Sequence, residues 1–129
     1  MPVDPLVVVH VIAAAALVVA AAVVGAWGLV RARSIANPAR RREGAAFTQL
    51  LQLSHSLVIA TGLIGLFLLG DGHRPDDPLH ARVYGPFMVI AILAAYGYRT
   101  DRAVTNVRVF AIVSLVILAL GARALVTGG

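Results

Sequence analysis

The chain has 129 residues, of which 60% are hydrophobic, and it carries a formal net charge of +5. It contains no cysteine, which excludes disulfides, thiolate zinc sites and iron–sulfur clusters. All eleven basic residues are arginine, and eight of them lie in two short stretches between apolar runs, which is typical of membrane-protein loops facing lipid headgroups and not of a nucleic-acid-binding surface.

Four apolar runs predict four membrane-spanning helices in a single domain covering residues 1–129. The approximate limits of these spans are 6–30, 45–69, 79–98 and 109–126. Arginine-rich loops mark the cytoplasmic side of a membrane protein. The pattern therefore predicts an all-α, up-down-up-down bundle with both termini on the outer side.

The first span begins with residues that favour a helix N-terminus, and the first cytoplasmic loop follows it. Pro5 suits the first helical position, and Asp4 suits the positive end of the helix dipole. A cleaved signal peptide is not expected, because an acidic residue precedes the apolar run and arginines follow it. The loop at 31–44 holds five arginines, and Pro38 should end any helix that continues through it.

The second span is polar in its cytoplasmic half. Thr48, Gln52 and His55 fall at helical spacing on one face, which we expect to point into the bundle because lipid would penalise it. At about 1.5 Å per residue, His55 lies roughly 15 Å in from the cytoplasmic side. It could serve a second haem or a proton route with Gln52, or it could be a structural residue satisfied by a hydrogen bond to Gln52 or a carbonyl.

The third span carries most of the polar side chains that a bilayer disfavours. His80, Arg82 and Tyr84 lie in its first turns, and Pro86 should kink it. His80, Tyr84 and Met88 share one face. Towards the other end of this span, Tyr96 and Tyr98 are typical of an aromatic belt at the cytoplasmic interface.

Two histidines on separate spans are expected at the same height. His10 lies about one turn inside the outer end of the first span, and His80 lies at the outer end of the third span. First and third helices are diagonal in an antiparallel bundle, a spacing that suits two imidazoles on one iron. We therefore predict haem b held by His10 and His80, with Arg82, Tyr84 and Arg123 available to its propionates. The alternative is that each histidine simply meets water near the headgroups.

Short motifs in these spans carry a family resemblance. The run His10-Val11-Ile12-Ala13 is similar to an "LHVIA" opening, Leu79-His80-Ala81-Arg82 to "WLHxK", and Ala95-Tyr96-Gly97-Tyr98 to an "AYxxY" end. With the order of the spans, they make most of the chain resemble small membrane proteins related to HemJ-type protoporphyrinogen oxidase and CopD-like membrane domains.

The resemblance implies a multi-pass protein of the bacterial inner membrane that binds haem b through His10 and His80. It also implies oxidation of protoporphyrinogen to protoporphyrin, with electrons passed to the respiratory chain. Pro78 and Arg82 depart from the family's tryptophan and lysine. Arginine cannot easily give up a proton, so the departure leaves haem or tetrapyrrole binding as the firmer implication.

Three functions follow as hypotheses. The first is a haem-binding protein for electron transfer or tetrapyrrole handling, and the second is an enzyme of the protoporphyrinogen oxidase type. The third is a cofactor-free accessory subunit of a respiratory or other membrane complex, docked through the apolar outer face of the fourth span. Besides the lipid bilayer, a second copy of the chain is an open partner, whereas nucleic acid is not expected.

Overall fold

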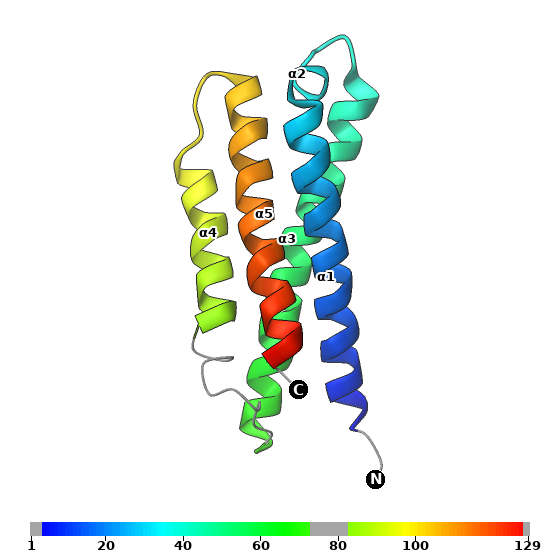
Figure 1. The fold of residues 1–129 in the computed structure, drawn as a ribbon, viewed down its shortest axis with the longest axis vertical. Coiled ribbons are helices and arrows are strands. Elements are labelled where there is room, and N and C mark those ends of the chain that lie inside the picture. The colour runs from blue at the N-terminus through cyan, green and yellow to red at the C-terminus, as the bar shows by residue number, and fades with distance from the viewer. Residues whose placement is uncertain (1–3, 73–82, 128–129) are drawn as a thin grey trace.

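A computed structural model describes residues 4–72 and 83–127, which form five helices and no strand (Figure 1). The helices are α1 (Pro5–Val30), α2 (Ala32–Ile35), α3 (Arg41–Gly70), α4 (Gly85–Gly97) and α5 (Ala103–Thr127). The predicted all-α class is thereby confirmed. Three of the helices, α1, α3 and α5, are long and apolar enough to cross a membrane.

The first helix begins as its sequence predicts. The Leu6 N–H donates to the Asp4 carboxylate at 2.8 Å, and Pro5 occupies the first turn, where its missing N–H costs nothing. The helix then runs for 26 residues, or about 39 Å, which exceeds the roughly 30 Å of a bilayer core.

The predicted loop at 31–44 contains structure that the sequence did not indicate. One helical turn, α2, follows α1 and buries Ile35 against the core. Beyond Pro38 the chain turns, and α3 begins at Arg41. The Arg31 Nε donates to both carboxylate oxygens of Glu43, at 3.0 and 2.9 Å, which ties the end of α1 to the start of α3.

The fourth helix, α4, is shorter than the span predicted at 79–98. It has 13 residues, or about 20 Å, and the helical turn before it, at Val83 and Tyr84, is of the π type. Pro86 lies in the first turn of α4, a position where a proline is tolerated because its missing N–H would have no partner within the helix. A kink at Pro86 in a longer span stays a prediction, because the residues up to 82 lie outside the described ones. That this segment completes a fourth membrane span stays a prediction.

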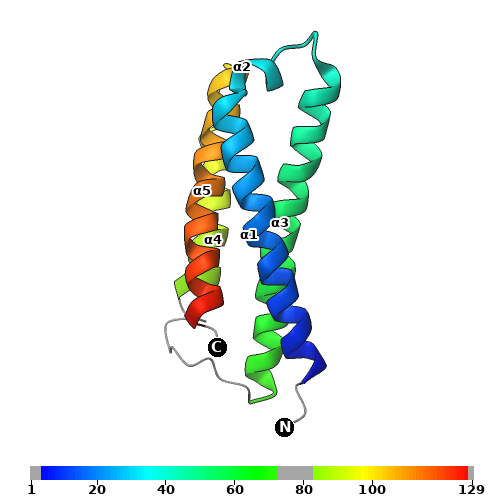
Figure 2. The ribbon, with the colours of Figure 1, turned by 45° about the vertical axis from the view of Figure 1, so that its right-hand side comes forward.

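Successive long helices run in opposite directions (Figure 1). The first, α1, packs against α5 and α3, whereas α4 packs mainly against α5 and more loosely against α3 (Figure 2). We call the end that holds α2 and the start of α5 the arginine-rich end. The other end, where α1 begins and α5 ends, is the terminal end.

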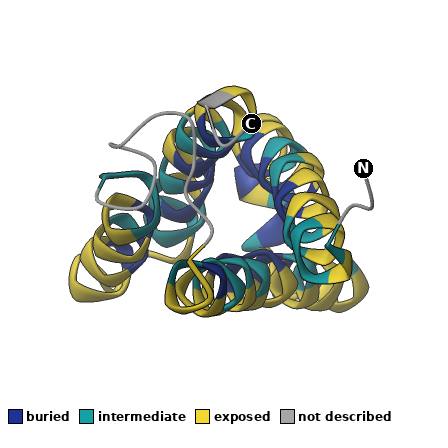
Figure 3. Ribbon diagram, turned by 90° about the horizontal axis from the view of Figure 1, so that it is seen from below, coloured by how far each residue is buried: buried dark blue, intermediate teal, exposed yellow. Residues whose placement is uncertain are grey.

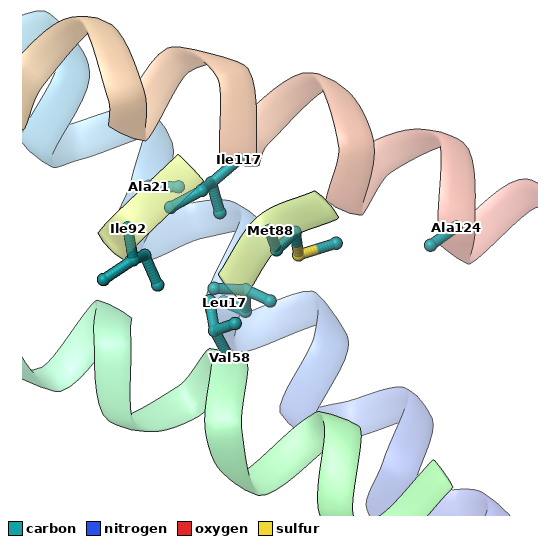
Figure 4. Close-up of a cluster of buried hydrophobic side chains, with 7 residues drawn as sticks. All are labelled: Leu17, Ala21, Val58, Met88, Ile92, Ile117 and Ala124. Carbon is teal, nitrogen blue, oxygen red and sulfur yellow. The ribbon is translucent and has the colours of Figure 1, made fainter. Parts of the chain in front are cut away.

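The helices enclose a narrow apolar core and expose apolar side chains around it. Exposed residues lie on the outer sides of the helices and buried residues face inward (Figure 3). Many leucine, isoleucine, valine and phenylalanine side chains are exposed on the outer surface, which suits lipid and would be a liability in water. One core cluster draws on α1, α3, α4 and α5 (Figure 4): Leu17, Ala21, Val58, Met88, Ile92, Ile117 and Ala124.

Small residues bring α1 and α5 into close contact. A Cβ added at Gly28 would lie 2.6 Å from the Cβ of Ala111 and 3.2 Å from the Phe47 ring. A Cβ added at Gly25 would meet only the flexible end of Leu115 within 3 Å. Gly28 is therefore the tighter point of this helix pair, as expected where helices pack in lipid without a hydrophobic driving force.

Candidate functional site

Of the five residues predicted to bind a cofactor, the three that the structure describes lie in two places. His10 and Tyr84 lie towards the terminal end, and His55 lies halfway along α3. The predicted partners His80 and Arg82 lie outside the described residues. The pairing of His10 with His80 on one iron therefore stays a prediction.

His10 faces the neighbouring helix α3 and is only partly exposed. Its Cε1 lies 3.2 Å from the position that a Cβ on Gly65 would occupy, and its Nε2 lies 3.8 Å from that position. A Cβ at position 65 would therefore be in tight contact with the imidazole, and the glycine makes room for it. A histidine that simply reached for water at the headgroups would not need this space.

Tyr84 and Met88 support the predicted face of the third span. Met88 is buried in the cluster shared by α1, α3, α4 and α5, and Tyr84 packs against the same cluster one turn nearer the terminal end. Both side chains therefore face the bundle. This confirms the shared face for the two described members of the set.

His55 is buried between α4 and α5. Its Nδ1 lies 3.3 Å from the hydroxyl of Tyr96, a hydrogen bond whose donor depends on the histidine tautomer. The Tyr96 ring stands edge-on to the imidazole with centroids 5.7 Å apart, and the Phe110 ring lies 6.1 Å away. Helices α3, α4 and α5 therefore each contribute one ring to this cluster, which we call the His55 cluster.

The second imidazole nitrogen of His55 is a buried polar atom with unused bonding capacity. Nε2 is shielded from solvent and has no hydrogen-bond partner within residues 4–72 and 83–127. If Nδ1–H donates to Tyr96, Nε2 keeps a lone pair, which is the form of histidine that binds metals, with its other nitrogen held by a hydrogen bond. His55 could therefore act as a ligand from inside the bundle.

The prediction that Thr48, Gln52 and His55 all point into the bundle is wrong for Thr48 and Gln52. Thr48 and Gln52 are exposed, and only His55 points into the bundle. The reason is the position of α4, which ends at Gly97, just beyond the residue that contacts His55. The part of α3 between His55 and the arginine-rich end therefore has no α4 beside this face. Tyr96, and not Gln52, is the partner of His55.

The contribution of Tyr96 was missed in the sequence. Counting residues from the predicted span ends puts Tyr96 at the interface and His55 about 15 Å deeper. In the structure α4 ends below the tops of α1 and α5, and the chain from Tyr98 to Arg102 climbs to the arginine-rich end (Figure 1). The sequence did contain a signal, because the five residues from Tyr98 to Arg102 are mostly polar. A connection of that length allows α4 to end well before the level at which α5 begins.

Two buried serines accompany these rings in the bundle. Ser54 and Ser114 are fully buried, and their hydroxyls have no hydrogen-bond partner among the described residues. Serine hydroxyls without partners are costly in an apolar interior. Their hydroxyls are therefore available as hydrogen-bond donors and acceptors in the core of the bundle.

The described residues contain no group of three or more histidine and acidic side chains placed to hold a metal ion. A haem needs fewer protein ligands, since its ring supplies four of the six. Comparisons with protein-family models, with curated proteins and with solved structures give no match to this chain. The residues themselves therefore carry the functional argument, and the likeness to HemJ-type and CopD-like proteins stays an expectation from short motifs.

Replacing Tyr96 with phenylalanine should lower the free energy of unfolding by about 0.6 to 1.7 kcal/mol, the range measured for hydrogen bonds between membrane helices. The substitution removes the hydroxyl 3.3 Å from His55 and keeps the ring against Phe110. Denaturation in mixed detergent micelles measures it. Tyr98→Phe is the matched control, because both tyrosines are exposed but the Tyr98 hydroxyl makes no hydrogen bond to the described residues, so this variant should not respond. An equal response of the two variants would contradict the assigned hydrogen bond.

Proposed function

We propose that this chain is a four-span membrane protein that binds haem b near the outer surface and serves electron transfer or tetrapyrrole handling. Three described helices have the length and hydropathy of membrane spans. In this proposal α4, together with the residues that precede it, makes the fourth. The arginine-rich end faces the cytoplasm, so that both termini lie outside.

The observation that carries the haem proposal is the placement of His10. Its imidazole lies against the backbone of α3 at Gly65, inside the bundle and near the outer surface. Helix α1 packs closely with α3 and α5, and α4 packs with α5, so α1 and α4 occupy opposite corners of the bundle. Opposite corners are where two axial ligands of one haem would stand, which supports His10 and His80 as the pair.

The remaining residues of the proposed site would act on the edge of the haem. Arg82 would pair with a propionate by a charge-assisted hydrogen bond, and Tyr84 would bond to the same group. The Tyr84 ring packs on the apolar cluster of the bundle, which would keep water from that edge. When bound, the haem supplies one-electron redox chemistry; the protein supplies its ligands, its burial and the charge beside it. Because Arg82 cannot readily release a proton, the proposal does not extend to oxidase activity.

His55 belongs to a separate place in this proposal. It lies ten residues from Gly65 along α3, or about 15 Å, so it cannot bind the same iron as His10. Its Nε2 fits the role of a ligand to a second haem, held in the correct tautomer by Tyr96. A measured ratio of one haem per chain would indicate the His10 site alone, and a ratio of two would indicate a second haem at His55.

The absorption spectrum of protein purified from haem-replete cells tests the proposal. We expect a Soret band in the oxidised protein and split α and β bands after reduction with dithionite. Haem extraction should give at least one haem per chain. Colourless protein would contradict haem binding and favour the cofactor-free accessory subunit instead.

A further inference from the structure

The arginine-rich end contains a surface hollow between the turn after α2 and the first turns of α5. The hollow is shallow and open to the surroundings, with a volume of about 590 Å³. Arg33, Arg102 and Arg108 line it, together with Asn37. We call it the arginine hollow.

The three guanidinium groups of the arginine hollow are not paired with a carboxylate in the part of the chain that the structure describes. Arg33, Arg102 and Arg108 have no ion-pair partner within residues 4–72 and 83–127, whereas nearby Arg31 is held by Glu43. The hydrogen bond that Arg31 donates to Glu43 and the attraction of the Glu43 charge raise the pKa of Arg31. Arg31 is thus already paired. Three of the unpaired arginines at this end of the bundle, Arg33, Arg102 and Arg108, therefore line one hollow.

Backbone donors add to the same site. Residues 103–105 line the hollow, and they form the first turn of α5, whose N–H groups have no carbonyl to bond within the helix. Guanidinium groups that bond in a planar fork and backbone N–H groups at a helix start both recognise phosphate oxygens. The charged side chains, not the helix end alone, select for an anion here.

An adjoining hollow gives the site an apolar side. It has a volume of about 350 Å³ and shares Arg33 and Arg108 with the arginine hollow. Its other lining residues are the apolar Leu29, Val30 and Ala32 and the polar Arg31 and Ser34. Val30 is 81% exposed. A ligand with a phosphate next to a hydrocarbon chain would satisfy both sides at once.

We propose that the arginine hollow binds the phosphate of an anionic ligand, and that the apolar side formed by Leu29 and Val30 favours a phospholipid over a free phosphate. The site lies at the end of the bundle opposite His10 and is independent of haem. A protein that does not bind haem would therefore not contradict the phospholipid site. A protein that does not bind phospholipid here would likewise not contradict haem binding.

Native mass spectrometry of the full chain in neutral detergent tests the proposal. Phosphatidylglycerol, phosphatidylcholine with the same acyl chains, and inorganic phosphate are added separately, and the bound fraction is measured for each. The double variant Arg33→Gln/Arg108→Gln should bind phosphatidylglycerol about 25-fold more weakly than the native chain, roughly fivefold per arginine near a membrane surface. Phosphatidylcholine binding should change little.

The double variant Arg41→Gln/Arg42→Gln is the matched control. It removes the same charge from the same end of the bundle, at exposed positions that do not line the hollow. Its affinity for phosphatidylglycerol should fall less than about threefold, because diffuse charge is screened within a Debye length. Binding of inorganic phosphate as tight as that of the lipid, and lost with Arg33 and Arg108, would confirm the phosphate site and overturn the lipid preference. Equal losses in both double variants would overturn the site itself.

Discussion

Replacing His10 with alanine should remove the Soret band of the protein proposed to bind haem at the terminal end. An axial imidazole is the bond that holds haem b in a protein without covalent attachment, and a methyl group cannot replace it. The imidazole of His10 is held inside the bundle against Gly65, so the variant loses a ligand and leaves a space of the same size. Absorption spectra of the purified variant, oxidised and reduced, measure the effect.

Added imidazole separates the loss of a ligand from the loss of the fold. Free imidazole should enter the space left in His10→Ala and restore a Soret band at millimolar concentration, which a misfolded protein would not allow. His80→Ala should behave in the same way. An unchanged spectrum in either variant would show that the axial ligands have been assigned wrongly.

His55→Leu serves as the comparison for these variants. Leucine fills much of the space of imidazole, so the bundle should stay folded. His55 is about 15 Å from the level of His10, so the haem at the terminal end should keep its spectrum. If the native chain carries two haems, His55→Leu should lose one of them and His10→Ala the other.

The helices could be predicted from hydropathy because few backbone structures are possible in lipid. A run of about twenty apolar residues must satisfy its own backbone, so α1, α3 and α5 follow almost directly from composition. The start of α1 also follows, since Asp4 and Pro5 specify it by local chemistry. Hydropathy did not reveal α2, because one helical turn buries only Ile35 and Ala32 and has no period to detect.

The candidate site was less predictable because contacts between helices depend on their relative height. Residue counting placed His55 correctly inside the bundle but gave it the wrong neighbours. The early end of α4 brings Tyr96 to His55 and leaves Gln52 exposed on α3. Height offsets of this kind are set by loop length and by packing of small residues, and neither can be derived from the period of a single helix. The glycine opposite His10 is likewise a relation between two helices.

Replacing Gly28 with alanine should destabilise the bundle by about 1 to 3 kcal/mol, the usual cost of overpacking a filled core. The added methyl would lie 2.6 Å from the Cβ of Ala111, which cannot move without its backbone, and 3.2 Å from the Phe47 ring. Helices α1 and α5, which share the most extensive contact of the structure, would have to separate. The free energy of unfolding in mixed detergent micelles measures the change.

Two further glycine substitutions make this prediction specific to close helix contact. Gly62→Ala should be neutral or stabilising by up to about 1 kcal/mol, because no atom lies within 4 Å of the added Cβ and alanine is the better helix former. Gly25→Ala should fall between the two, since the atoms within 3 Å of its Cβ belong to the flexible Leu115 side chain. A Gly28→Ala variant as stable as the Gly62→Ala variant, whose substitution lies on α3, would mean that α1 and α5 do not approach each other closely at Gly28.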